Sequence, residues 1–293
     1  MPIYKQTYRS YEGRMVHRFR WMVIVEQELR VLIKTRPFLL LVLVAMLHIM
    51  VRLLQVVACD VIIQDPNNPL TPLLKTVQGI MVDERMFFDF LRLQAPVVFI
   101  VCLYAGSGMI CNDVRNNLLE VYFSKPIRWY DYALGKILTL ALIGLCLTAV
   151  PGLLLVILHN LLIPGDNWQT LFATYWWSGA ILGFSLILIL PCVLGILACS
   201  ALLPSQNFSA IAVVMVLVAD SAMGTLLAVL LQERNYLLIS FPMAMNRVGQ
   251  GLFNDHRLYF DLRWEWSLLF VTVVCLWGAW VVFRRARRAE IAL

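Results

Sequence analysis

Six long runs of apolar residues constrain this chain more than any other feature. The runs cover residues 37–58, 88–111, 135–162, 170–199, 208–232 and 265–283. A helix needs about 20 apolar residues to cross the hydrocarbon core of a bilayer, because each residue advances it by only about 1.5 Å. Lipid also requires that backbone hydrogen bonds be made internally, as a helix does. The sequence therefore predicts an all-α polytopic membrane protein with six transmembrane helices.

The composition agrees with hydrocarbon as the solvent for most side chains. Hydrophobic residues make up 61% of the chain and charged residues only 14%. The net charge of +6 comes from residues that flank the apolar runs. Anionic lipid and membrane topology account for basic residues in such places, so we expect membrane lipid and no nucleic acid among the partners.

The distribution of Lys and Arg predicts the orientation, because basic residues near the ends of spans favour the cytoplasmic side. An even number of spans puts both termini on one side. With the loop between the second and third spans, the two termini hold 16 of the 24 basic residues. We therefore expect both termini in the cytoplasm and the protein in a bacterial inner membrane.

Two flanking segments complete the expected organisation around a transmembrane domain at 37–283. Residues 1–36 form a cytoplasmic segment with an amphipathic pattern over 16–34, where apolar residues share one side; they are Met22, Val25, Leu29 and Leu32. This pattern predicts a helix lying in the membrane interface, either as an anchor alone or as part of a docking site. Residues 284–293 form a basic cytoplasmic tail.

An outer segment at 233–264 separates the fifth and sixth spans. Its apolar stretch is interrupted by polar residues and helix breakers, namely Pro242, Asn246, Arg247 and Gly249. Such a stretch is too short and broken to span a bilayer. We expect a re-entrant or interfacial helical hairpin there.

The polar loop at 112–134 interrupts the apolar sequence with an ordered pattern. Four residues share one face of a short predicted helix: Leu118, Leu119, Tyr122 and Phe123. Arg115 and Glu120 lie off that face, Pro126 ends the helix, and a second helix begins near Trp129. A membrane protein thus presents a structured surface to something soluble.

This loop resembles the first cytoplasmic loop of the permeases of type-2 ATP-binding cassette (ABC) exporters. The matching elements are the acidic-x-Arg at Asp113, Asn117-Leu118-Leu119-Glu120, Ser124-Lys125-Pro126-Ile127 and Tyr132-Ala133-Leu134-Gly135-Lys136. The six spans and the N-terminal amphipathic segment resemble the same family. The chain departs from the family in having Asn116-Asn117 in place of the usual Gly-Thr.

The resemblance implies that the loop helix is a coupling helix. Arg115, Leu118, Leu119, Glu120, Tyr122 and Phe123 would then bind a cytoplasmic ABC ATPase subunit. Two permease copies, in a homodimer or a related heterodimer, would work with two ATPases. No Gly-x-x-x-x-Gly-Lys-Ser/Thr motif occurs in this chain. ATP and Mg²⁺ are therefore expected on the partner ATPase, with no cofactor, metal or catalytic residue on this chain.

Asp220 is the strongest candidate site within a span, because it lies about midway along the fifth apolar run. A carboxylate in that place costs about 2.5–3.5 kcal/mol on insertion scales, so it needs a partner, water or a proton. Two interpretations stay open. Asp220 lies on a transport path between two permease copies, or it forms an interhelical hydrogen bond that stabilises packing.

The remaining polar residues within spans suggest no metal site. His48 and Arg52 are spaced i, i+4 on the first span, while His159 near a span end and His256 in a loop stand isolated in the sequence. The seven cysteines show no CxxC spacing and are read as small hydrophobic residues.

The expected function is transport, as the permease subunit of an ABC exporter with its ATPase on a separate chain. The alternative is a noncatalytic membrane anchor or assembly subunit that recruits a cytoplasmic partner through the same loop. A membrane enzyme is disfavoured, because the spans offer few His residues and no paired carboxylates.

Overall fold

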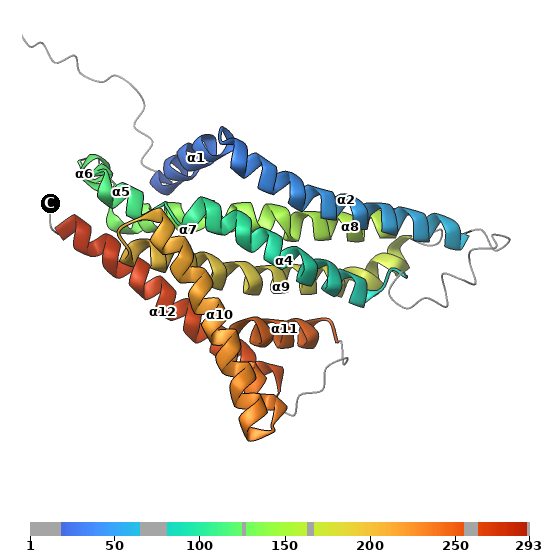
Figure 1. The fold of residues 1–293 in the computed structure, drawn as a ribbon. Coiled ribbons are helices and arrows are strands. Elements are labelled where there is room, and N and C mark those ends of the chain that lie inside the picture. The colour runs from blue at the N-terminus through green and yellow to red at the C-terminus, as the bar shows by residue number, and fades with distance from the viewer. Residues whose placement is uncertain (1–18, 65–80, 125–126, 163–166, 255–262, 292–293) are drawn as a thin grey trace, which may run out of the picture.

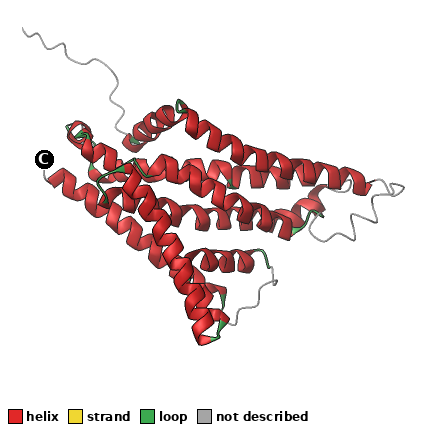
Figure 2. Cartoon of the chain, viewed as in Figure 1, coloured by secondary structure: helices red, strands yellow, loops and turns green. Residues whose placement is uncertain are grey.

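The computed structural model describes residues 19–64, 81–124, 127–162, 167–254 and 263–291, and these residues form helices without strands (Figures 1 and 2). The helices are α1 (Arg20–Ile33), α2 (Arg36–Gln64), α4 (Glu84–Gly106), α5 (Cys111–Arg115), α6 (Leu118–Phe123), α7 (Trp129–Leu147), α8 (Ala149–Leu162), α9 (Asn167–Leu202), α10 (Gln206–Leu231), the 3₁₀ helix η1 (Arg234–Ile239), α11 (Phe241–Leu252) and α12 (Trp264–Ile291).

Six helical stretches in the described residues are long and apolar enough to cross a membrane, which confirms the predicted spans. They are Arg36–Ile62, Glu84–Arg115, Trp129–Leu162, Thr174–Leu202, Gln206–Leu231 and Trp264–Arg288. Most extend past the apolar runs, because the helices continue into polar sequence at their ends. The second span begins where the Asp83 side chain caps α4 by accepting a hydrogen bond from the Met86 amide at 3.0 Å.

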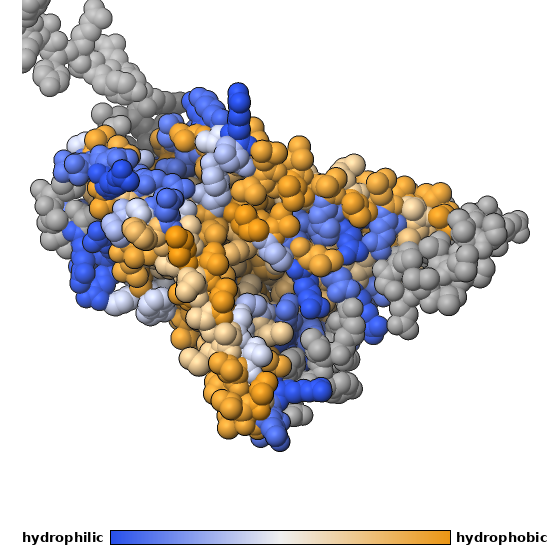
Figure 3. Space-filling view, in the orientation of Figure 1, coloured by the Kyte–Doolittle hydropathy of each residue, from blue (hydrophilic) through white to orange (hydrophobic). Residues whose placement is uncertain are grey.

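The polar segments of the chain gather at one end of the bundle. α1, α5, α6 and the end of α12 lie together there, while α2, α4, α8 and α9 run side by side away from it (Figure 1). Hydrophilic residues gather at this end and again toward the opposite side, and hydrophobic residues cover much of the surface between them (Figure 3). α12 stays helical through the basic residues at 284–288 instead of ending at the last apolar residue.

The six spans differ in how much of their surface this chain covers. In the most apolar part of each span, 61% of residues are buried in the third and the fourth, but only 11% in the first and the fifth. α9 is central: its Ile181, Val193 and Leu197 are fully buried. α2 and α10 therefore lie at the periphery, with most of their apolar surface open to lipid or to another chain.

The third span breaks at Thr148 into α7 and α8, and the break follows from Pro151. Proline has no N–H and its ring clashes with the carbonyl four residues earlier, so the carbonyl of Leu147 loses its helical partner. The buried side chain of Gln94, on α4, donates to this oxygen at 3.1 Å and to the Ala45 carbonyl of α2 at 3.4 Å. His48 contacts the same amide, at 2.6 Å from its oxygen. One glutamine thus joins three spans.

The outer segment contains η1 and α11. α11 has 12 residues and is therefore about 18 Å long, too short to cross a hydrocarbon core of about 30 Å. It packs against α9 and α12, with Ala244 and Val248 fully buried (Figure 1). η1 and α11 are the helices of the segment at 233–264, and residues 255–262 lie outside the described part.

Candidate functional site

The loop predicted at 112–134 begins with two short helices, α5 and α6, joined at Asn117, and α6 is the short helix expected there. This residue has a φ of 54° and a ψ of 26°, the left-handed conformation. Glycine and asparagine adopt it at the lowest cost. Asparagine at position 117 therefore suits the backbone that joins α5 to α6. α5 is also tied to α9, because Ser200 Oγ accepts from the amides of Ile110 and Cys111 at 3.1 and 3.2 Å.

The six residues predicted to bind a partner fall into two groups, one facing the core of this chain and one facing outward. Leu119, Tyr122 and Phe123 pack partly buried against this chain's own core. The rings of Tyr122 and Phe123 lie 5.6 and 6.2 Å from the ring of Tyr132 on α7.

The other three predicted residues face outward. Arg115 and Glu120 are exposed, and Leu118 is 39% exposed. Val121, which the sequence analysis did not select, is 55% exposed. The surface that α6 offers to another molecule therefore consists of Leu118, Glu120 and Val121, and we call these three residues the outer face of α6.

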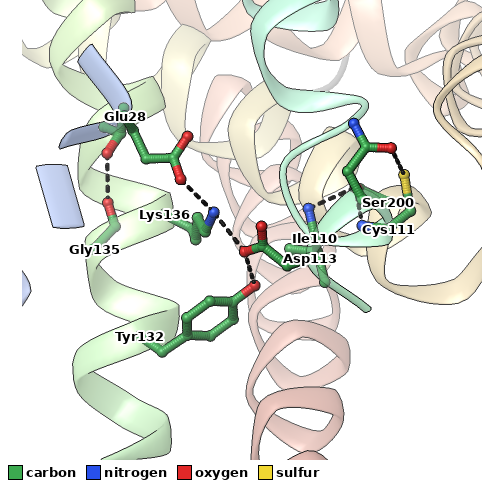
Figure 4. A network of polar contacts seen from close by, with 10 residues as sticks. Glu28, Ile110, Cys111, Asp113, Tyr132, Gly135, Lys136 and Ser200 are labelled. Atoms are coloured by element: carbon green, nitrogen blue, oxygen red, sulfur yellow. Dashed lines mark hydrogen bonds and ion pairs between the residues drawn. The ribbon is translucent and has the colours of Figure 1, made fainter. Parts of the chain in front are cut away.

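A buried ion network lies beneath this helix and centres on Lys136 of α7 (Figure 4). The Lys136 ammonium is 2.6 Å from Glu28 Oε1 on α1 and 2.7 Å from Asp113 Oδ2 on α5. Tyr132 donates its hydroxyl proton to the same Asp113 oxygen at 2.8 Å. The ammonium also lies 5.9 Å from the Tyr122 ring of α6. Four helices thus meet at one cation.

The electrostatics of the network explain why a lysine can be buried here. Lys136 is fully buried, and moving one ion into a protein interior costs several kcal/mol even after relaxation. Two carboxylates and two aromatic faces replace the water that it loses. Burial also raises the pKa of the Tyr122 phenol, although the nearby Lys136 charge opposes that effect. The phenol therefore stays neutral and offers its ring to the ammonium.

Gly135 makes the contact between α1 and α7 possible. A Cβ at this position would lie 2.9 Å from the Cβ of Ile24 and 3.2 Å from the Trp21 carbonyl oxygen. Such distances are below normal contact, so only glycine lets α1 approach this closely. The next residue, Lys136, can then reach Glu28. Gly135 thus allows α1 to pack closely on α7, and the charge of Lys136 stabilises that packing.

The network connects elements rather than offering reactive groups, because each charge is already paired. It links the N-terminal helix, the loop helices and the start of the third span. Sequence reasoning noted Asp113 and Lys136 as elements of a motif but did not pair them, and it missed Glu28. The only available signal for Glu28 was an acidic residue in a segment otherwise rich in basic residues.

Asp220 has a defined partner. Its Oδ2 accepts a hydrogen bond from the Phe241 amide at 2.6 Å, at the first residue of α11. A carboxylate here satisfies an unpaired amide and lies at the positive end of the helix dipole. Asp220 also borders a recess of about 280 Å³ among α9, α10 and α12, and it is the only charged residue among the described residues that line it. The hydrogen bond to the Phe241 amide favours a packing role for Asp220. The adjacent apolar cavity favours a place on a transport path, so both interpretations stay open.

The interpretation of His159 as isolated is wrong. Its Nδ1 lies 2.8 Å from Asp60 Oδ2, and both residues are buried. The ring also stacks on Trp177 at 5.8 Å. The two partners are 99 positions apart in the chain, so no local pattern could join them. His256 lies outside the described residues.

No protein-family model matches this chain, and no curated protein matches it either.

Proposed function

We propose that this chain is the membrane-spanning permease subunit of an ABC-type exporter, driven by ATP hydrolysis on a separate ATPase subunit. The observation that supports this most is the loop helix α6, held on the spans by the Lys136 network with its outer face turned away from the core. A helix that transmits force between a soluble motor and spans must be attached rigidly to those spans. The network provides such an attachment.

Residues of the loop that carries the family resemblance support the proposal. Asp113 and Lys136, which begin and end the motif segment, form one ion pair. α6 sits between them along the chain, at the same end of the bundle as α1 and the end of α12 (Figure 1). On this proposal that end is cytoplasmic, α1 lies in the membrane interface, and α6 is the coupling helix that meets the ATPase with its bound ATP and Mg²⁺.

A second permease copy fits the proposal. The first and fifth spans leave most of their apolar surface uncovered, and Asp220 lies on the fifth. A cavity between two copies would bring this face of each chain together. Such a pair would recruit two ATPases.

Copurification with an ATP-hydrolysing partner tests the proposal. The tagged chain is purified in mild detergent from its own host, and Mg-ATP hydrolysis by the purified complex is measured. We expect hydrolysis in the wild type and its loss, with the partner, in Leu118→Glu/Val121→Glu, because two charges desolvated in an apolar groove disfavour docking.

Ile239→Glu is the matched control. Ile239 is 41% exposed in η1, on the other side of the fifth span, where a cytoplasmic partner would not reach it. Its substitution is expected to leave the partner bound. If the Leu118/Val121 variant keeps a fully active partner, or if the wild-type complex hydrolyses no ATP, the proposal fails.

The alternative is an anchor subunit that recruits a cytoplasmic partner without transport, which the same outer face of α6 would also serve. The two differ in coupling. In a transporter, Lys136→Met should change the ATPase rate of a partner that stays bound, whereas an anchor would show an unchanged rate.

A further inference from the structure

A recess of about 440 Å³ lies between the start of α7 and the last turns of α12. Its lining combines aromatic and basic side chains: Trp129, Trp280, Phe283, Arg284 and Arg287. Trp129 and Phe283 hold its two walls together, with their rings 5.8 Å apart and nearly perpendicular. The recess is separate from the Lys136 network and from the outer face of α6, so neither accounts for its composition.

The two arginines of the recess carry charges that no carboxylate in the described part of the chain balances. Arg284 and Arg287 are exposed and one helical turn apart, so they share a face. The Arg284 guanidinium stacks on Trp280, with its central carbon 4.7 Å from the ring centroid. Among the described residues, no carboxylate lies within ion-pair distance of either arginine. The recess is therefore preorganised for an anion.

The arginines end a continuous exposed stripe on α12. Val273, Trp277 and Trp280 are 55%, 59% and 54% exposed and precede Arg284 and Arg287 at alternating steps of four and three. That spacing keeps all five on one face of a helix. A single ligand lying along this face would meet apolar surface, then a tryptophan at the usual depth of the interface, and then two cations.

We propose that this stripe and recess bind one anionic phospholipid, with its phosphate between Arg284 and Arg287 and an acyl chain along Trp280, Trp277 and Val273. Guanidinium groups match phosphate because their donors form a planar fork. From residue 273 to residue 287 the helix rises about 21 Å, which spans one leaflet of about 15 Å of hydrocarbon and reaches the headgroups. The site does not depend on the transport function proposed above.

A lipid fits this stripe better than an acidic segment of a protein partner. The apolar part runs directly away from the recess into the most apolar portion of a span, where a soluble segment would lose its own hydration. A phospholipid has the same order, with a charged headgroup followed by an apolar acyl chain. A free phosphate ion would use the arginines but not the apolar residues.

The test compares lipid affinity between two charge-matched variants. Purified protein in neutral detergent is titrated with phosphatidylglycerol, phosphatidylcholine or inorganic phosphate, while the thermal midpoint and the lipids retained in native mass spectra are recorded. We expect Arg284→Gln/Arg287→Gln to weaken phosphatidylglycerol binding at least tenfold. Arg285→Gln/Arg288→Gln removes the same charge from the same turns but outside the recess, and should change affinity less than twofold.

Each other result counts against the site. Equal weakening in both pairs means a diffuse field of charge, and no weakening in either means that the recess binds no lipid. Inorganic phosphate competing at millimolar concentration would assign the recess to a soluble anion. If the Gln pair does not fold, Arg284→Lys/Arg287→Lys keeps the charge but loses the fork, and several-fold weakening is expected.

Discussion

Replacing Lys136 by methionine tests whether the buried network holds α1 and α5 on the third span. The change keeps the length and apolar stem but removes the cation. Breaking a buried ion pair costs about 3–5 kcal/mol, mainly because the remaining charge has no partner. The Glu28 side chain is 19% exposed and can recover some water, and the Asp113 side chain, 9% exposed, keeps the Tyr132 hydroxyl. We therefore expect the lower value, about 3 kcal/mol.

Thermal unfolding in detergent measures this loss. For chains of about 150–250 residues, each kcal/mol shifts the midpoint by about 2–4 °C, so we expect Lys136→Met to lower it by about 6–12 °C. Lys34→Met, at the exposed residue directly after α1, is the matched control and should stay within about 1 °C of the wild type. Because the pair is buried, high salt should change the difference little.

A variant with all three charges neutralised distinguishes the effect of an unpaired charge from the effect of poorer packing. In Lys136→Met/Asp113→Asn/Glu28→Gln no charge is left unpaired, so at least half of the loss should return. The reasoning is refuted if Lys136→Met unfolds at the wild-type midpoint. It is also refuted if the triple variant is as unstable as the single one, because the damage would then come from shape.

Three further changes test single contacts. Gln94→Leu leaves two carbonyls and His48 without the amide, and should lower stability by about 1–3 kcal/mol in the same assay; an unchanged midpoint would show that the broken span needs no such partner. Gly135→Ala forces α1 outward, so we expect faster proteolysis within α1, and unchanged cleavage would contradict the close approach. Asp220→Asn keeps an oxygen for the Phe241 amide and should fold normally, whereas Asp220→Ala should cost about 1–2 kcal/mol; equal stability of the two would remove the capping role.

The spans were predictable because lipid imposes a length and a composition on each helix separately. The helix at 118–123 was also predictable, from the period of its apolar residues and the proline after it. The period could not show what those residues face. Leu119 and Phe123 turn toward this chain's own core, where the Phe123 ring lies against that of Tyr132.

The charged contacts were hidden for a different reason. Glu28 and Lys136 are 108 positions apart, and each taken alone resembles an ordinary interfacial charge. His159 and Asp60 are separated in the same way. A pairing of this kind depends on how helices pack, and packing is a property of the whole bundle. The sequence indicates which charged residues in apolar segments need partners, but it does not indicate which residues those partners are.

The glutamine that joins three spans also limits how this protein can change shape. Rotation of α2 against α4, or of α4 against the broken third span, would separate Gln94 from carbonyls that have no water to replace it. These three spans therefore form a fixed frame within the bundle. The fifth span has little of its surface buried in this chain, and its central charge is bound to a short helix instead of to the frame. A change of conformation therefore costs least where this span and α11 shift together against that frame.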